Sequence, residues 1–224
     1  MAADVKARFP HEAWHQTWCD VGLCWIGAIR DALPSGYSIF ESTHFILLSR
    51  ADEGKAEELL RYLERADLKI RDAMPALIPA EIYGKCAVVV FQEEENFYEY
   101  VSMFIEGEGS FGAMGGVYLN RGYGHFAMPS PDLARYATVF AHELCHAYLS
   151  HLQLPLWLDE AITAGVEDSV EGGNAYHLDR DVIRRHQDYW TEEKIEGFWK
   201  GTSFLSDDEG QELGYHLARF ILKA

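Results

Sequence analysis

The sequence predicts an α+β domain, because strand-like segments lie mostly in its first half and its helical segments dominate the second. Two segments carry most of this prediction. "KCAVVVFQ" at 85–92 is a continuous apolar run with three successive valines, which is typical of a central strand buried on both faces. "SPDLARYATVFAHELCHAYLSHLQLP" at 130–155 has the length and the boundary residues of a long helix. A chain of 224 residues, 48% of them hydrophobic, can bury the core of one such domain.

The segments before the valine-rich strand alternate in type. "WCDVGLCWIGAIRDAL" at 18–33 is expected to be a helix, and it leads into the turn signal "LPSG". "YSIFESTHFILLS" at 37–49 alternates and carries β-branched and aromatic residues, which indicates one or two strands. The stretch 51–74 predicts an amphipathic helix that ends before two prolines. Its apolar residues at helical spacing are Leu59, Leu60, Leu63, Ala66 and Ile70.

The segments after that strand predict an edge strand and several helices. "EENFYEYVSMFI" reads as a helix, and a glycine-rich stretch then leads into "VYLNRG", a predicted edge strand. Ser130 suits the N-cap and Pro131 the first position of the long helix, and Pro155 bounds its end. Two further helices are expected at 158–170 and 210–223. We therefore expect a helical N-terminal extension at 1–40, packed on a main domain at 41–224 that has a small mixed sheet and a helical C-terminal part.

Composition argues against several classes of partner. The net charge of −17 disfavours nucleic acid, because phosphates would be repelled. No apolar run approaches the roughly 18–20 residues that span a bilayer, and the first residues do not resemble a secretory signal. The four cysteines form neither a CxxC pair nor the dense pattern of a disulfide scaffold. We expect reduced thiols, a cytoplasmic location and no membrane association.

The segment "VFAHELCHAYL" at 139–149 carries a candidate metal site. Its His142 and His146 are four residues apart, so on a helix they share one face and both imidazoles can reach one ion. Glu143 lies at the edge of that face, where its carboxylate can accept a proton without ligating the metal. A predicted apolar stripe occupies the opposite side of the helix. Its members are Leu133, Ala137, Phe140, Leu144 and Tyr148.

A third ligand is needed, because catalytic zinc usually has three protein ligands and one open position. Glu160 in "LPLWLDEAITAGVED" lies at the start of the next expected helix, after a turn at Pro155, so the chain can fold back to bring it near the histidines. Asp159 is adjacent and is the rival ligand.

Other residues with metal-binding side chains fit the site less well. His151 lies half a turn away from the face that carries the two histidines. Cys145 flanks that face on the side opposite Glu143, where a packing role is favoured. His177 and Asp179 are interpreted as surface or loop groups.

"HELCH" followed closely by "LPLWLDEA" resembles the gluzincin metallopeptidases, specifically a compact bacterial group described as peptidase-MA-like. That group typically shows HExxH and then P-x-W-L-x-E-G. The resemblance implies that His142, His146 and Glu160 bind zinc and that Glu143 is the general base. It also implies a zincin-like fold with a thermolysin-like catalytic core.

The match has two departures. The framework residues that agree with the motif are Pro155, Trp157 and Leu158. Ala161 stands where the family has glycine, and Ala164 stands where related enzymes often carry a carboxylate that orients a histidine ligand. The orienting group must then come from elsewhere, for which Glu167 and Asp168 are candidates.

The resemblance covers roughly residues 40–224, with less specific matches outside the two motifs. "GGVYLN" takes the place of the edge strand that holds an extended peptide by main-chain pairing in similar enzymes. "GYHLARFIL" is similar to the closing tyrosine-containing helix, which implies that Tyr215 donates to an oxyanion. A core aromatic is an equal alternative for Tyr215.

The sequence thus predicts a zinc-dependent hydrolase, specifically a metallopeptidase that uses a zinc-activated water, with a peptide or protein as its substrate. The alternative from another class is a zinc-containing peptide-binding or regulatory module with no or very narrow proteolytic activity. A globular protein without a metal is the third interpretation.

Overall fold

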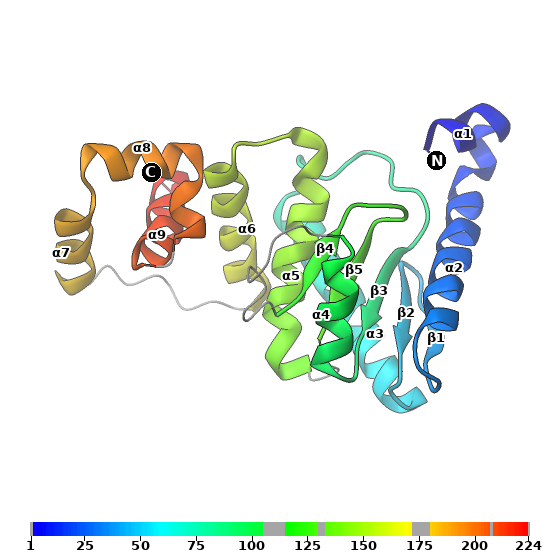
Figure 1. Cartoon of the computed structure of the whole chain (residues 1–224). Helices are drawn as coiled ribbons and strands as arrows, with labels where there is room; N and C mark the ends of the chain where they lie inside the picture. The colour runs from blue at the N-terminus through cyan, green and yellow to red at the C-terminus, as the bar shows by residue number, and fades with distance from the viewer. Residues whose placement is uncertain (1, 105–114, 130–132, 172–179, 207, 224) are drawn as a thin grey trace. The chain divides into compact units, whose positions relative to one another are not determined.

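The computed structural model describes residues 2–104, 115–129, 133–171, 180–206 and 208–223. It shows a mixed α+β chain with one five-stranded mixed sheet and many helices, which confirms the predicted class (Figure 1). The strands, in spatial order, are β1 (Ser38–Glu41), β2 (Phe45–Ser49), β3 (Cys86–Val90), β5 (His125–Met128) and β4 (Val117–Leu119). The three inner strands run parallel and each edge strand is antiparallel to its neighbour. The valine-rich strand is therefore central and 117–119 is an edge strand, both as predicted.

The helices agree with the sequence where its periodicity is strong. They are α1 (Ala2–Arg8), α2 (Trp14–Ala32), α3 (Glu53–Ala73), α4 (Glu94–Ser102), α5 (Leu133–Leu149), α6 (Leu156–Glu171), α7 (Arg180–Tyr189), α8 (Glu192–Lys200) and α9 (Gly210–Lys223). Helices α2 to α6 and α9 confirm the predicted ones, with ends shifted by a few residues. β5, α7 and α8 were not predicted from the sequence. Ser130, the predicted N-cap, and Pro131, the predicted first residue of the long helix, lie outside the described residues.

The chain divides into two compact units, one of residues 1–68 and 79–143, the other of residues 69–78 and 144–224. The predicted N-terminal extension belongs to the same unit as the sheet. The division into an extension at 1–40 and a main domain at 41–224 stays a prediction.

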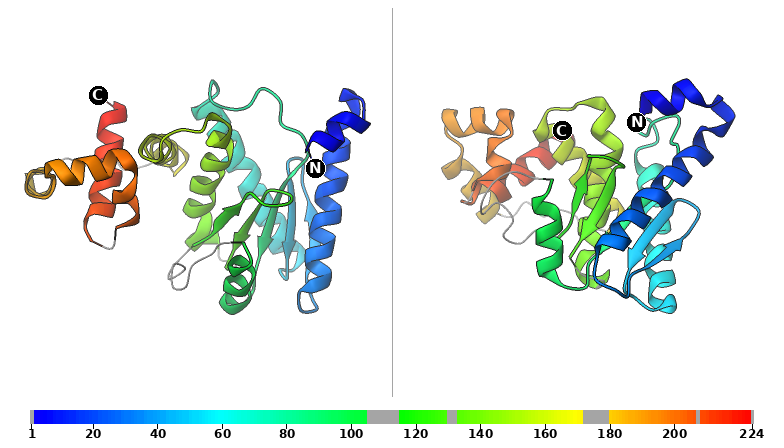
Figure 2. Two further views of the ribbon diagram at one scale, coloured as in Figure 1. Left: turned by 45° about the horizontal axis from the view of Figure 1, so that its top comes forward. Right: turned by 45° about the vertical axis from the view of Figure 1, so that its right-hand side comes forward.

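In the first unit the sheet is buried on both faces. Ile46, Leu48 and Val89 belong to one hydrophobic cluster with side chains of α2 and α4, and Figure 2 shows α2 running along the sheet. The neighbouring strand residues point to the opposite face. There the ring of Phe140 on α5 lies 6.0 Å from the ring of Phe45. Burial on both faces explains why β2 and β3 read as continuous apolar runs without polar alternation.

The second unit has its own smaller core. Its buried members are Ala161, Phe198, Phe204 and Ala218, which come from α6, α8, the turn after α8, and α9. Thr191 begins α8 as its N-cap, because its side chain accepts the N–H of Lys194 at 3.3 Å. Gly201 ends α8 with φ of 83°, and a Cβ there would lie 2.9 Å from the Cβ of Leu156. This position needs glycine for its backbone conformation and for its close packing.

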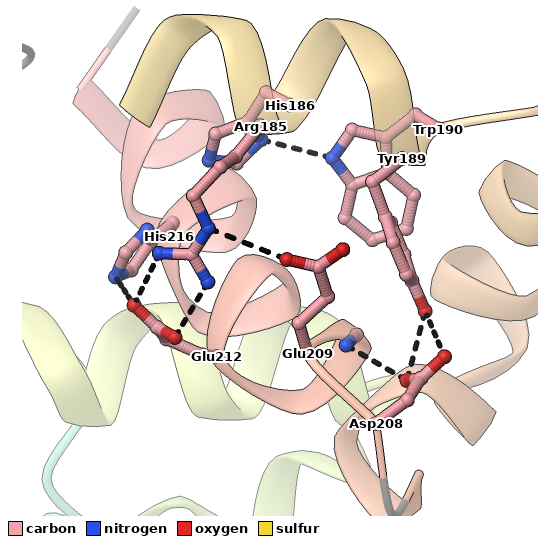
Figure 3. A network of polar contacts seen from close by, with 9 residues as sticks. Arg185, His186, Tyr189, Trp190, Asp208, Glu209, Glu212 and His216 are labelled. Atoms are coloured by element: carbon pink, nitrogen blue, oxygen red, sulfur yellow. Dashed lines mark hydrogen bonds and ion pairs between the residues drawn. The ribbon is translucent and has the colours of Figure 1, made fainter. Parts of the chain in front are cut away.

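Helix α7 is held to α9 by long polar side chains (Figure 3). The guanidinium of Arg185 donates to both carboxylate oxygens of Glu212 at 3.0 and 2.8 Å and to Glu209 at 3.3 Å. Beside this ion pair the rings of His186 and His216 lie 5.8 Å apart. Trp190 Nε1–H donates to His186 Nδ1 at 2.9 Å, so α7 also anchors the residue that follows it.

The histidines of this network predict a loss of stability in mild acid. Burial lowers the pKa of both rings, and the charges of Arg185 on His186 and of Arg219 on His216 lower it further. The two histidines therefore bind protons more readily in the unfolded chain than in the folded chain. The free energy of unfolding decreases as the pH falls below about 6.5. We expect His186→Gln to lose less unfolding free energy than the wild type between pH 7.5 and 5.5, measured by urea denaturation. Equal losses in the two proteins would contradict this assignment.

Candidate metal centre

Helix α5 carries the histidine pair and buries the side chains next to it. Phe140 and Leu144, at 1% and 2% exposure, form the buried side as predicted. His142 and His146 are half-buried and one turn apart. The side chains of Leu133 and Ala137, also assigned to the apolar stripe, lie outside the described residues.

A tight connection leads from α5 to the helix that carries Glu160. A short 3₁₀ turn at Ser150–Leu152 follows α5, and Gln153 then adopts a left-handed conformation with φ of 51°. The carbonyl oxygen of Pro155 accepts two backbone N–H groups of the first turn of α6, at 2.9 and 3.1 Å. The chain therefore reverses and starts a new helix within a few residues, so that Glu160 lies in the early part of α6.

The structure brings the three predicted ligands together. One ligand atom from each of His142, His146 and Glu160 lies within 4.8 Å of the other two, and no other such group occurs in the part of the chain that the structure describes. His146 Nε2 is 3.5 Å from Glu160 Oε2. Two ligands that each lie about 2.1 Å from a tetrahedral zinc ion are about 3.4 Å apart. The donor types, and the spacing of this one pair, are compatible with a tetrahedral divalent ion such as zinc.

Asp159, the rival ligand, contacts the other nitrogen of the same ring. His146 Nδ1–H donates to Asp159 Oδ1 at 3.0 Å, and Thr163 Oγ1 lies 3.4 Å from that nitrogen. This contact fixes the ring so that Nε2 faces Glu160, which is the usual task of a carboxylate behind a metal-bound histidine. Glu167 and Asp168 were the groups predicted for this task, and the side chain of Asp168 lies outside the described residues. The contact with Asp159 was not predicted.

The two carboxylates give the centre a strong preference for a cation. Burial lowers the pKa of His146, but hydrogen bonds and charge interactions with Asp159 and Glu160 outweigh it and raise the pKa to about 10. Glu160 is only 8% exposed, and a buried carboxylate requires a positive partner. A divalent cation that ligates Nε2 must displace its proton, so metal affinity at this centre is expected to increase with pH.

Glu143 lies outside the ligand group and contacts the edge strand. Its Oε2 accepts the backbone N–H of Tyr118 in β4 at 3.3 Å. The amide thus holds the carboxylate at the edge of the sheet, next to the helix face that carries the histidines. This placement agrees with a glutamate that handles protons and does not bind metal, and its catalytic role stays a prediction.

The ring of Tyr215 is partly buried and packs against the hydrophobic cluster of the second unit. It meets the ring of Phe204 edge-on, with centroids 5.2 Å apart. These contacts agree with the core-aromatic alternative, and donation to an oxyanion stays a prediction.

The remaining residues with metal-binding side chains take no part in the ligand group. His151 is exposed, and its Nδ1–H donates to the carbonyl oxygen of Tyr148 at 2.8 Å. Cys145 is fully buried, and this burial, with smaller effects of nearby carboxylates, raises its pKa to about 12, so it is a neutral core thiol. All four cysteines are free thiols. His177 and Asp179 lie outside the described residues.

Removing the contact behind His146 should weaken metal binding. Asp159→Ala leaves the ring free to rotate and lowers its basicity, so we expect zinc affinity to fall about 10- to 100-fold. Asp159→Asn keeps an oxygen that accepts the Nδ1 proton and is expected to lose much less. Competition with a chromogenic chelator measures both affinities. An unchanged affinity in the alanine variant would exclude Asp159 from the centre.

Among the described residues, no helix combines the length and the apolar character needed to cross a membrane.

Comparison of the chain with protein family models and with curated proteins found no match.

Proposed function

We propose that the protein is a zinc-dependent hydrolase of the gluzincin type, specifically a metallopeptidase with a zincin-like catalytic core. The observation that carries the proposal is the convergence of two imidazoles from α5 and one carboxylate from α6. The position of Glu143, close to these ligands yet bonded to β4, adds a second argument. A purely structural metal site has no need for such a glutamate.

The chain's own residues have separate tasks in this proposal. His142, His146 and Glu160 hold the ion, and Asp159 keeps the ring of His146 in place through Nδ1. When bound, zinc lowers the pKa of a water molecule and polarises the carbonyl that the water attacks. Glu143 accepts the proton of the attacking water and delivers it to the leaving amine.

The edge strand gives the proposal its substrate class. Among the described residues β4 pairs with β5 alone, so an extended peptide can add to its other side by main-chain hydrogen bonds once it displaces Glu143 from the N–H of Tyr118. Such a peptide would lie next to Glu143, because the N–H of Tyr118 already contacts that carboxylate. In this proposal Tyr215 donates a hydrogen bond to the oxyanion of the substrate.

The decisive experiment is elemental analysis of protein purified without added metal. We expect about one zinc per chain in the wild type and a large loss in His142→Ala and in Glu160→Ala. His151→Ala is the matched control, because it removes an exposed histidine that lies outside the ligand group. A wild-type protein without metal would refute the proposal.

Cleavage of a broad peptide library then separates an enzyme from a binding module. Zinc-dependent cleavage supports the metallopeptidase. Stoichiometric zinc without cleavage of any peptide would favour a regulatory or peptide-binding module instead.

A further inference from the structure

A pocket of about 640 Å³ lies between the C-terminal half of α2 and helix α4, within the first unit. Tyr100, which lines it, belongs to the hydrophobic cluster on the α2 and α4 side of the sheet. Phe140 of α5 packs on the other side, against Phe45 and Phe126. The pocket is therefore separate from the helix face that carries HExxH, and the proposed metallopeptidase does not use it.

The walls of the pocket are apolar and aromatic. Trp25, Ile29 and Leu33 line it from α2, and Tyr100 and Met103 line it from the α4 side. Met103 is 67% exposed and adds apolar surface to the pocket. The volume falls within the roughly 300–1,000 Å³ of pockets that hold small organic ligands.

The one charged residue that lines the pocket is acidic. Glu99 is an exposed carboxylate. Asn96 uses one N–H of its Nδ2 to donate to Glu93 at 3.1 Å, and its carbonyl oxygen can accept a hydrogen bond from a ligand. The residues that line the pocket include neither a lysine nor an arginine nor a histidine.

Tyr100 also presents an acceptor, because its proton is committed. His125 Nδ1–H donates to the carbonyl oxygen of Tyr123 at 2.7 Å, so Nε2 of this ring carries the lone pair. The hydroxyl of Tyr100 therefore donates to Nε2 at 2.6 Å. A ligand that complements Glu99 and Tyr100 supplies a positive charge and a hydrogen-bond donor.

We propose that this pocket binds an organic cation, a protonated amine or guanidinium carried on an apolar body. The apolar body lies between Trp25 and Met103, where it covers exposed hydrophobic surface. The cationic group reaches Glu99 and the side-chain oxygen of Asn96. The proposal is independent of the metal centre.

The test is a titration of the full chain with 4-phenylbutylamine, followed by ¹H–¹⁵N NMR. We expect shifts concentrated in residues 25–34 and 96–103. 4-Phenylbutanol and 4-phenylbutyrate, which have the same apolar body without the charge or with the opposite charge, should bind at least about three-fold more weakly. A Lys-containing amphipathic helical peptide tests a peptide groove in place of a small-molecule pocket.

Three variants locate the interaction. Glu99→Gln should weaken the amine about three- to five-fold and leave the alcohol unchanged, since Glu99 is exposed and its ion pair is screened. Glu95→Gln, an exposed residue of the same helix outside the pocket, is the matched control and should bind as the wild type does. Ala32→Trp should fill the space and abolish binding of the amine.

Several results would overturn the proposal. The first is equal affinity for the three head groups, and the second is amine binding that Glu99→Gln leaves intact. The others are shifts centred outside residues 25–34 and 96–103, and no binding of the amine. Binding of the helical peptide alone would reassign the pocket as a docking groove for another protein.

Discussion

Glu143→Gln should bind zinc with near wild-type stoichiometry and lose hydrolysis by about 10²- to 10⁴-fold in kcat/KM, the usual contribution of a positioned acid–base group. The amide of glutamine has nearly the shape of the carboxylate, and its oxygen can still accept the N–H of Tyr118. It cannot take a proton from the attacking water, however. The loss should therefore appear in turnover and leave the fold and the metal content intact.

The measurement combines peptide cleavage with elemental analysis of the same preparation. Glu94→Gln, an exposed residue of α4, is the control for the loss of one negative charge. Undiminished turnover in Glu143→Gln would remove this residue from the mechanism. A loss of zinc in parallel with activity would instead assign Glu143 to the metal.

Phe140→Ala should lower the free energy of unfolding by about 3–5 kcal/mol, the usual cost of removing a buried aromatic ring. Phe140 is 1% exposed, and its ring lies 5.1 Å from the ring of Phe126 and 6.0 Å from that of Phe45. The truncation leaves a cavity between the sheet and the helix that carries the histidine pair. Urea denaturation monitored by circular dichroism measures the change.

Two variants calibrate this effect. Phe140→Leu retains much of the volume and should cost clearly less than the alanine variant. Phe9→Ala removes a ring that is 45% exposed and should be nearly neutral. A loss below about 1 kcal/mol in Phe140→Ala would mean that α5 is not anchored to the sheet through this ring.

Local sequence predicted the elements whose pattern is long or strongly apolar. The helix at Glu53–Ala73 and the valine-rich strand are such cases. β5 spans only His125–Met128, and its strand character depends on pairing with β3, which begins 39 positions earlier at Cys86. α7 is short and polar, and it is stabilised by the bonds of Arg185 to Glu209 and Glu212. These partners are distant in sequence, so the local sequence does not predict the helix.

The site shows the same limit. The three ligands could be predicted from the sequence, because ligand chemistry restricts the residue types and their spacing. The contacts around the ligands could not be predicted. Adjacent acids at positions 159 and 160 look interchangeable in sequence, and only the direction of each side chain from α6 shows that Asp159 meets Nδ1 of His146 and Glu160 approaches Nε2. The N–H that binds Glu143 belongs to Tyr118, on a strand distant from it in sequence. Every residue except proline has a backbone N–H, so the residue type does not reveal this donor.

The bond between Tyr118 and Glu143 also bears on self-association. An open sheet edge is a template onto which strands of other molecules can add, and proteins protect such edges with short strands and charged groups. β4 has three residues, and a carboxylate already takes the N–H of the middle one. While Glu143 accepts this N–H, the donor cannot pair with a strand of another molecule. The same side chain therefore also lowers the tendency of the edge strand to aggregate.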